Sequence, residues 1–142
     1  RTIPSMLNYQ IHADAGSMFN TPPVFAVFTS MLNMRWVKAQ GGIEKLGEKN
    51  MFKSNLLYSE IDRNSKFIGF AAIEDRSEMN ATFNLVDPAD GEAFDTLCNS
   101  AGISGLKGHR SVGGYRASMY NALPVKSLQV LVDCMQTLEE KN

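Results

Sequence analysis

Every second position is apolar in two stretches of the chain, which is the pattern of a β-strand with one buried face. In residues 79–85 the apolar positions are Met79, Ala81, Phe83 and Leu85, and in residues 115–120 they are Tyr115, Ala117 and Met119. The mostly apolar residues 67–71 predict a further strand, and residues 103–107 predict another short one. The hydrophobic pattern therefore predicts four short strands, all in the later part of the chain.

A longer periodicity, with apolar residues three and four positions apart, predicts two long helices before the first strand. The first helix begins at Pro22, with Thr21 as its N-cap, and runs to about Gln40, where Gly41 and Gly42 stop it. Its apolar residues cover so much of the helix surface that we expect burial on more than one side. The second helix covers residues 43–62, and its many charged positions, Lys53 among them, predict a solvated outer surface.

Two further helices alternate with the strands. Residues 91–101 have an apolar helical face and are followed by Gly102, a typical C-cap, and the last helix begins at Pro124. The order is thus two helices, two strands, a helix, two strands and a helix, which favours an α+β two-layer sandwich. The sequence contains no internal repeat and no low-complexity linker, so we expect a single domain over residues 1–142.

Composition narrows the class of protein. Of the 142 residues, 44% are hydrophobic, which is enough for a buried core and argues against a disordered chain. The formal net charge is −1, so the chain lacks the overall field that attracts nucleic acid or an acidic membrane.

Cys98 and Cys134 lack the spacing of a zinc site and lie on apolar helix faces, so we expect reduced core thiols and a cytoplasmic protein. Because the first residue is Arg1 rather than methionine, we expect the chain to begin partway through a longer protein.

The first segment that could carry chemistry is residues 17–23, at the start of the first long helix. A helix N-terminus presents unpaired N–H groups and a partial positive charge, and Asn20 and Thr21 add side-chain donors there. This combination predicts a site for a phosphate group. The alternative is that Thr21 only caps the helix.

The second segment is residues 108–118, in which three glycines, two arginines and a histidine lie close together. The guanidinium groups of Arg110 and Arg116 can each bind a carboxylate or phosphate through two N–H donors, and protonated His109 adds another donor. One arginine on a strand and one in the preceding loop could hold the two ends of a small anionic ligand. The alternative is a solvated turn with surface arginines. We find no catalytic triad, metal-ligand spacing or nucleotide-binding pattern in the sequence.

These two segments together resemble the C-terminal part of the phosphoserine aminotransferase family, a class V family of pyridoxal-phosphate-dependent enzymes. The resemblance is carried by residues 17–23 and 107–122, and it extends to residues 76–80 and to the helix that contains Trp36. It implies the small C-terminal domain of the aspartate aminotransferase fold, type I, with a small, mainly antiparallel sheet and helices. Residues 1–22 would then connect this domain to a large domain outside the chain.

The resemblance also implies an activity and roles for particular residues. The family transfers an amino group between glutamate and 3-phosphohydroxypyruvate, giving phosphoserine and 2-oxoglutarate in serine biosynthesis, and it works as a homodimer. The residues that match Asn20 and Thr21 reach the phosphate of pyridoxal 5'-phosphate in the neighbouring subunit. Those that match His109 and Arg110 belong to the pocket for the substrate phosphate, and the match to Arg116 binds the substrate α-carboxylate.

One essential group of the family has no counterpart in this chain. The lysine that forms the Schiff base with the cofactor lies upstream of the matched region, and no lysine here fits its motif. We therefore name no catalytic residue and expect the 142-residue chain to be inactive by itself. The alternative is a stand-alone anion-binding or oligomerisation module derived from an aminotransferase.

Overall fold

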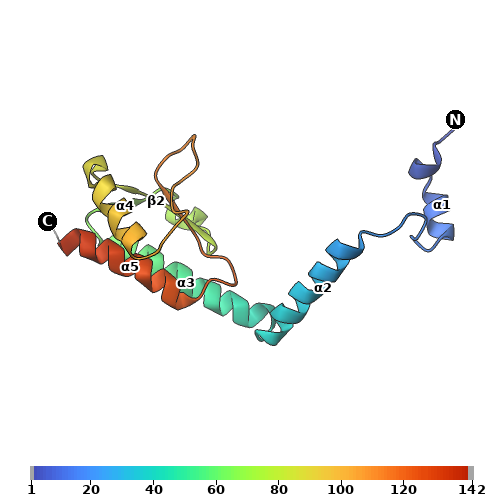
Figure 1. The fold of residues 1–142 in the computed structure, drawn as a ribbon, viewed down its shortest axis with the longest axis horizontal. Coiled ribbons are helices and arrows are strands. Elements are labelled where there is room, and N and C mark those ends of the chain that lie inside the picture. Colours follow the sequence, from blue (N-terminus) through green and yellow to red (C-terminus); the bar gives the residue numbers. More distant parts are fainter. Residues whose placement is uncertain (1, 141–142) are drawn as a thin grey trace. The chain divides into compact units, whose positions relative to one another are not determined.

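The computed structural model describes residues 2–140, and Figure 1 shows their helices and strands. The chain divides into two compact units, Arg1–Gly42 and Ile43–Asn142. Among the described residues, no helix is both long enough and apolar enough to cross a membrane.

The first unit consists of helices. A short 3-10 helix, η1 (Ser5–Leu7), and helix α1 (Tyr9–Asp14) lie in the segment that the sequence predicts as a connecting loop. The Asn8 side chain accepts a hydrogen bond from the Gln10 backbone N–H at 3.0 Å and so caps α1. The long helix α2 spans Val24–Ala39.

The predicted start of α2 is wrong by two residues. Its N-cap is Pro23 and its first residue is Val24, so Thr21 does not cap the helix and Pro22 does not begin it. The reason is the proline pair, because a proline disfavours the helical conformation of the residue before it. Pro23 therefore keeps Pro22 out of the helix, and Pro22 does the same to Thr21.

The predicted burial of α2 is also wrong for this chain, because no residue of α2 is buried. Phe25 is 79% exposed and Phe28 is 51% exposed, while Trp36 is half-buried. Such a run of exposed apolar side chains is uncommon on the surface of a monomeric protein and marks an interaction surface.

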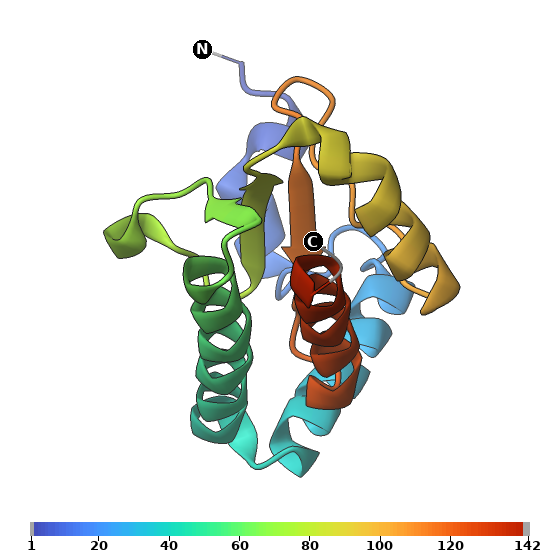
Figure 2. The same cartoon turned by 90° about the vertical axis from the view of Figure 1, so that its left-hand side faces the viewer.

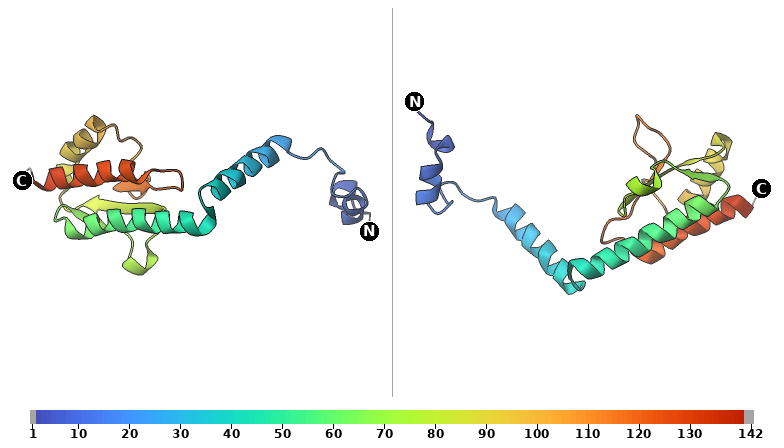
Figure 3. Two further views of the ribbon diagram at one scale, coloured as in Figure 1. Left: turned by 90° about the horizontal axis from the view of Figure 1, so that it is seen from below. Right: turned by 180° about the vertical axis from the view of Figure 1, so that it is seen from behind.

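The second unit is built around a three-stranded antiparallel sheet. Strand β2 (Asn80–Leu85) lies between β1 (Phe67–Gly69) and β3 (Tyr115–Ser118), with Phe83 opposite both Gly69 and Tyr115. Three helices pack against the sheet: α3 (Gly42–Arg63), α4 (Gly91–Ser100) and α5 (Val125–Glu140). Figures 2 and 3 show α5 between α3 and α4. The predicted α+β sandwich is therefore confirmed.

One face of this sheet meets the helices and the other is open. The core cluster joins Leu57 of α3, Phe83 of β2, Phe94 of α4 and Met135 of α5, all at 1% exposure or less. The alternation predicted for residues 79–85 and 115–120 is confirmed, because Ala81, Phe83 and Ala117 are buried while Arg116 and Ser118 are exposed. The open face is consequently polar along β3 and carries Arg116.

The strand predicted at residues 103–107 does not form. Within this segment only Lys107 makes a β-bridge, with Tyr115, and the Leu106 carbonyl accepts a hydrogen bond from the Arg116 N–H at 2.7 Å. Gly105 has φ +73°, in the left-handed region, so the extended conformation is interrupted there. The segment lies beside β3 as a loop and supplies two partner groups to it.

The two cysteines are in the core, as predicted. Cys98 on α4 and Cys134 on α5 are both free and buried. Burial raises the pKa of the Cys98 thiol to about 12, and the neighbouring Cys134 contributes to this shift. The thiols therefore stay protonated at neutral pH and act as small apolar core groups.

The expectation that Lys53 lies on a solvated helix face is wrong. This lysine is 1% exposed, and its ammonium donates to the carbonyl oxygens of Met119 at 2.8 Å and Tyr120 at 2.7 Å. Burial lowers the pKa of Lys53, because it removes the charged form from water. Helical periodicity cannot reveal such a contact, since its partners are backbone atoms about 66 residues away.

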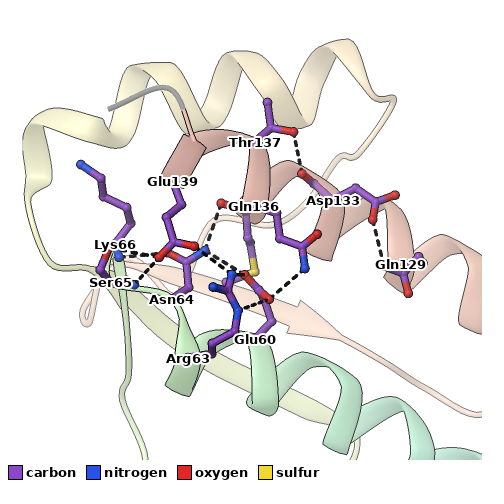
Figure 4. Close-up of polar contacts among 11 residues, drawn as sticks. Glu60, Arg63, Asn64, Ser65, Lys66, Gln129, Asp133, Gln136, Thr137 and Glu139 are labelled. Atoms are coloured by element: carbon purple, nitrogen blue, oxygen red, sulfur yellow. Dashed lines mark hydrogen bonds and ion pairs between the residues drawn. The ribbon is translucent and has the colours of Figure 1, made fainter.

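A buried carboxylate joins the end of α3 to α5. Glu60, 4% exposed, accepts hydrogen bonds from Arg63 at 2.7 Å, Asn64 at 2.8 Å and Gln136 at 3.1 Å (Figure 4). Burial by itself would raise the pKa of Glu60, but these donors outweigh it and the pKa lies below its usual value. Each donor stabilises the ionised form, so the network depends on the charge of Glu60.

We expect this network to make the stability of the chain depend on pH. Because the folded pKa of Glu60 is below the unfolded value, its contribution is complete above the unfolded pKa and decreases as pH falls through the folded pKa. Glu60→Gln should lower the free energy of unfolding at neutral pH by about 1–3 kcal/mol, since an amide leaves some donors without an acceptor. Urea unfolding at neutral and at acidic pH measures both effects. Glu48→Gln is the control, because Glu48 is exposed and its ion pair within the described part of the chain is with the exposed Lys45. Equal stability of the Glu60 variant and wild type at neutral pH would contradict this assignment.

Candidate functional site

The predicted glycine-rich loop, residues 108–114, is closed by its own backbone. The Gly108 N–H donates to the Gly114 carbonyl oxygen at 2.8 Å, and the N–H groups of Val112 and Gly113 donate to the His109 carbonyl oxygen at 3.0 and 2.8 Å. A Cβ atom at position 108 would overlap the Gly113 carbonyl oxygen, and one at position 114 would overlap the Asn84 side chain. Glycine is therefore required at both ends of the loop.

The histidine of this loop has a defined orientation. The Ser111 hydroxyl lies 2.7 Å from Nδ1 of His109, and the Ser111 backbone N–H donates to the same nitrogen at 3.3 Å. A backbone N–H can only donate, so Nδ1 is an acceptor and the proton of the neutral ring is on Nε2. The side chain is exposed, and its Nε2–H is left to donate to a ligand.

Two hollows adjoin this loop. The loop hollow has a volume of about 700 Å³ and is lined by Lys107, His109 and Arg110 together with Asp95 and Tyr115. The sheet hollow is smaller, about 220 Å³, and lies on the open face of the sheet. Its lining residues include Phe70, Thr82, His109, Val112 and Arg116. His109 is the histidine that lines both hollows, whereas Arg110 and Arg116 line different ones.

Both predicted arginines are available to a ligand. Arg110 and Arg116 are exposed, and among residues 2–140 neither guanidinium has a hydrogen bond or ion pair. Arg116 is fixed at its backbone, opposite Thr82 in the sheet register and bonded to the Leu106 carbonyl. The structure thus brings His109 and Arg116 to one hollow with free N–H donors, which suits a small anion.

The sequence gives no sign of one further residue at the site, Asp95 of α4. Its carboxylate accepts a hydrogen bond from the Tyr115 hydroxyl at 3.2 Å and lies 3.4 Å from the Lys107 ammonium. Burial, followed by the charge of Asp95, raises the pKa of Tyr115 to about 12, so the phenol remains a donor. Position 95 lies on the polar side of an ordinary amphipathic helix, and no local pattern distinguishes it.

The predicted cofactor-binding residues, Asn20 and Thr21, lie in the first unit, just before α2. Both are exposed, and the Asn20 amide is near the Met6 sulfur at 3.6 Å. The first helical hydrogen bond of α2 runs from Val27 to the Pro23 carbonyl, so the N–H groups of Phe25 and Ala26 precede it. These donors at an exposed helix N-terminus fit a phosphate group.

The second unit is a small α+β domain whose glycine-rich loop and open sheet face carry the exposed side chains of His109, Arg110 and Arg116. Sequence comparison makes this specific. The chain is 60% identical over 141 residues to the phosphoserine aminotransferase of Flavobacterium johnsoniae and 55% identical over 142 residues to that of Bacteroides thetaiotaomicron. Each alignment covers 99% of this chain and 40% of the relative. No protein-family model matches the chain.

Solved structures agree with the sequence comparison. Phosphoserine aminotransferase from Bacillus circulans subsp. alkalophilus matches 98% of this chain with a TM-score of 0.83 at 36% identity. Pyridoxal-phosphate-bound phosphoserine aminotransferase from Trichomonas vaginalis matches 94% with a TM-score of 0.77 at 34% identity. Each match covers 39% of the solved chain. The predicted resemblance is therefore confirmed: the chain is homologous to the C-terminal part of phosphoserine aminotransferase and spans about 40% of the length of the relatives it matches.

Proposed function

We propose that this chain is the substrate-binding C-terminal part of an enzyme that transfers an amino group between glutamate and 3-phosphohydroxypyruvate. The products are phosphoserine and 2-oxoglutarate, in the biosynthesis of serine. The observation that carries this proposal is that His109 and Arg116 line one hollow beside the glycine-rich loop. It is supported by the identity of 49–60% to eight phosphoserine aminotransferases. The reduced, buried cysteines favour the cytoplasm as its location.

The substrates that this reaction requires match the groups in the second unit. Both amino-acid substrates carry an α-carboxylate, and Arg116 would hold it through two parallel N–H donors worth about 1.5–3 kcal/mol each as charge-assisted bonds. Only phosphoserine and 3-phosphohydroxypyruvate carry a phosphate. His109 and Arg110 would bind that phosphate through the Nε2–H and the guanidinium. The chain thus supplies one residue common to all substrates and two that distinguish the phosphorylated pair.

The first unit would contribute to holding pyridoxal 5'-phosphate. Asn20, Thr21 and the free N–H groups at the start of α2 would bind its phosphate from the neighbouring subunit of a homodimer. When bound, this cofactor supplies the electron sink and carries the amino group between substrates. No lysine of this chain matches the cofactor-binding lysine, so the 142 residues by themselves would bind anions without catalysing transfer.

Amino transfer by the parent full-length protein is the direct test. We expect it to convert 3-phosphohydroxypyruvate and glutamate to phosphoserine and 2-oxoglutarate, and the 142-residue chain to show no turnover under the same conditions. A parent protein that is inactive with this pair, or active with an unphosphorylated keto acid in preference, would contradict the proposal.

A second candidate function, an oligomerisation module, is favoured by one observation, the exposed apolar surface of α2. Its large apolar side chains are each exposed by more than a third: Val24, Phe25, Val27, Phe28, Met31, Leu32 and Met34. This function is compatible with the first, because an aminotransferase dimer also needs an interface.

We expect the 142-residue chain to form dimers or larger oligomers through this surface. Replacing Phe25 and Phe28 by serine should shift it towards the monomer, since about 25 cal/mol of stabilisation is lost for each Å² of apolar area no longer buried. Sedimentation velocity over a range of concentrations measures the change. Tyr9→Ser is the control, because Tyr9 is 89% exposed but lies outside α2. A wild-type chain that remains monomeric at high concentration would contradict self-association.

A further inference from the structure

The base of the 108–114 loop is held by a side chain that lies outside it. Lys107 and Tyr115, the residues on either side of the loop, face each other in an antiparallel β-bridge. One carboxylate, that of Asp95, binds both of them: Oδ1 accepts from the Tyr115 hydroxyl at 3.2 Å, and Oδ2 lies 3.4 Å from the Lys107 ammonium. The Gly108–Gly114 hydrogen bond is the next contact towards the tip of the loop.

Asp95 can hold the loop because its own position is fixed. The residue before it, Phe94, is fully buried, and the Phe94 ring meets the Tyr115 ring edge to face at 5.0 Å. The Tyr115 ring also stacks on Phe83 at 5.6 Å. The aromatic contacts thus place the Tyr115 hydroxyl against α4, where the carboxylate accepts its hydrogen bond.

The contact between Asp95 and Lys107 adds little to the overall stability of the fold. The Lys107 side chain is 83% exposed, and an ion pair with so exposed a lysine stabilises a fold little. Its effect is local: the ion pair restrains Lys107 in the segment that enters the loop, while the contact with Tyr115 restrains β3, which follows the loop. The loop between them carries His109 and Arg110, and Asp95 lines the same hollow as both.

We infer that Asp95 is a positioning residue for phosphate recognition: by binding Lys107 and Tyr115 together, it holds the loop that presents His109 and Arg110 to the substrate phosphate. This inference rests on the proposed function for its kinetic consequences. Asp95 itself, as an anion, repels the phosphate, so its role is to orient the loop and not to bind the ligand. The cost of that repulsion is reduced by its pairing with Lys107.

Kinetics of the full-length protein test the inference with graded variants. Asp95→Ala removes both contacts, whereas Asp95→Asn keeps an acceptor for Tyr115 and removes only the ion pair. We expect Asp95→Ala to raise the KM for phosphoserine by about threefold or more and that for glutamate by less than about twofold, with Asp95→Asn between Asp95→Ala and wild type. Asp133→Asn on α5 is the matched control, since Asp133 is exposed and, among residues 2–140, accepts hydrogen bonds from Gln129 and Thr137 of α5. Equal changes in both KM values, or an unchanged KM for phosphoserine, would overturn the inference.

Amide hydrogen exchange separates this inference from the proposed function and from misfolding. In Asp95→Ala, we expect faster exchange at Gly108 and Gly113, whose N–H groups bond within the loop, and unchanged exchange in the middle of α5. Faster exchange everywhere would mean a general loss of stability and would overturn the inference, as would unchanged loop exchange. Failure of the wild-type protein to transfer amino groups would refute the proposed function alone, because the exchange result is independent of turnover.

Discussion

Replacing Arg116 by lysine in the full-length protein is expected to raise the KM for glutamate and for phosphoserine together, each by about tenfold or more. The reason is the α-carboxylate, which both substrates carry and which a guanidinium binds through two parallel N–H donors. Lysine keeps the positive charge but offers a single point of contact. Steady-state kinetics with each amino donor in turn measures the effect.

Arg110→Lys provides the contrast to Arg116→Lys. The same chemical change at position 110 should affect the phosphorylated substrates alone, because Arg110 lines the loop hollow and not the hollow of Arg116. A loss confined to one amino donor in the Arg116 variant would show that this residue does not bind the shared carboxylate.

The second large effect is expected from His109→Ala, which should weaken binding of phosphoserine and 3-phosphohydroxypyruvate about tenfold and leave glutamate nearly unchanged. The variant removes the Nε2–H that is free to donate to the phosphate, and a hydrogen bond to a charged group is worth about 1.5–3 kcal/mol. The KM values of the phosphorylated and unphosphorylated substrates give the comparison.

Ser111→Ala is the control for His109→Ala. It removes the hydroxyl beside Nδ1 and keeps the imidazole, so its effect on the phosphorylated substrates should be smaller. If His109→Ala reduced the affinity for glutamate and phosphoserine equally, His109 would act on the whole site and not on the phosphate.

The hydrophobic pattern correctly predicted the strands in which every second side chain is buried. Strands β2 and β3 alternate because one face packs on the helices, and Phe83 and Ala117 show this directly. The prediction for residues 103–107 was wrong because the sequence shows Gly105 but does not reveal that it adopts a positive φ. The predicted start of α2 was wrong because two successive prolines outweigh the capping preference of Thr21.

The candidate site, too, could be predicted from the sequence only in part. His109, Arg110 and Arg116 could be selected from the sequence, since glycines and cationic side chains gather there in an almost neutral chain. The sequence could not show that these residues line two different hollows, because that arrangement depends on how the loop folds back between Gly108 and Gly114. Lys53 and Asp95 were missed for a related reason, as their partners are distant in sequence.

The position of phosphoserine bound to the full-length protein would show whether His109, Arg110 and Arg116 bind this substrate. A crystal structure of that complex should show the α-carboxylate within hydrogen-bonding distance of the Arg116 guanidinium and the phosphate beside His109 or Arg110 of one of the subunits. Phosphoserine bound with its carboxylate and phosphate both away from these three side chains would contradict the account.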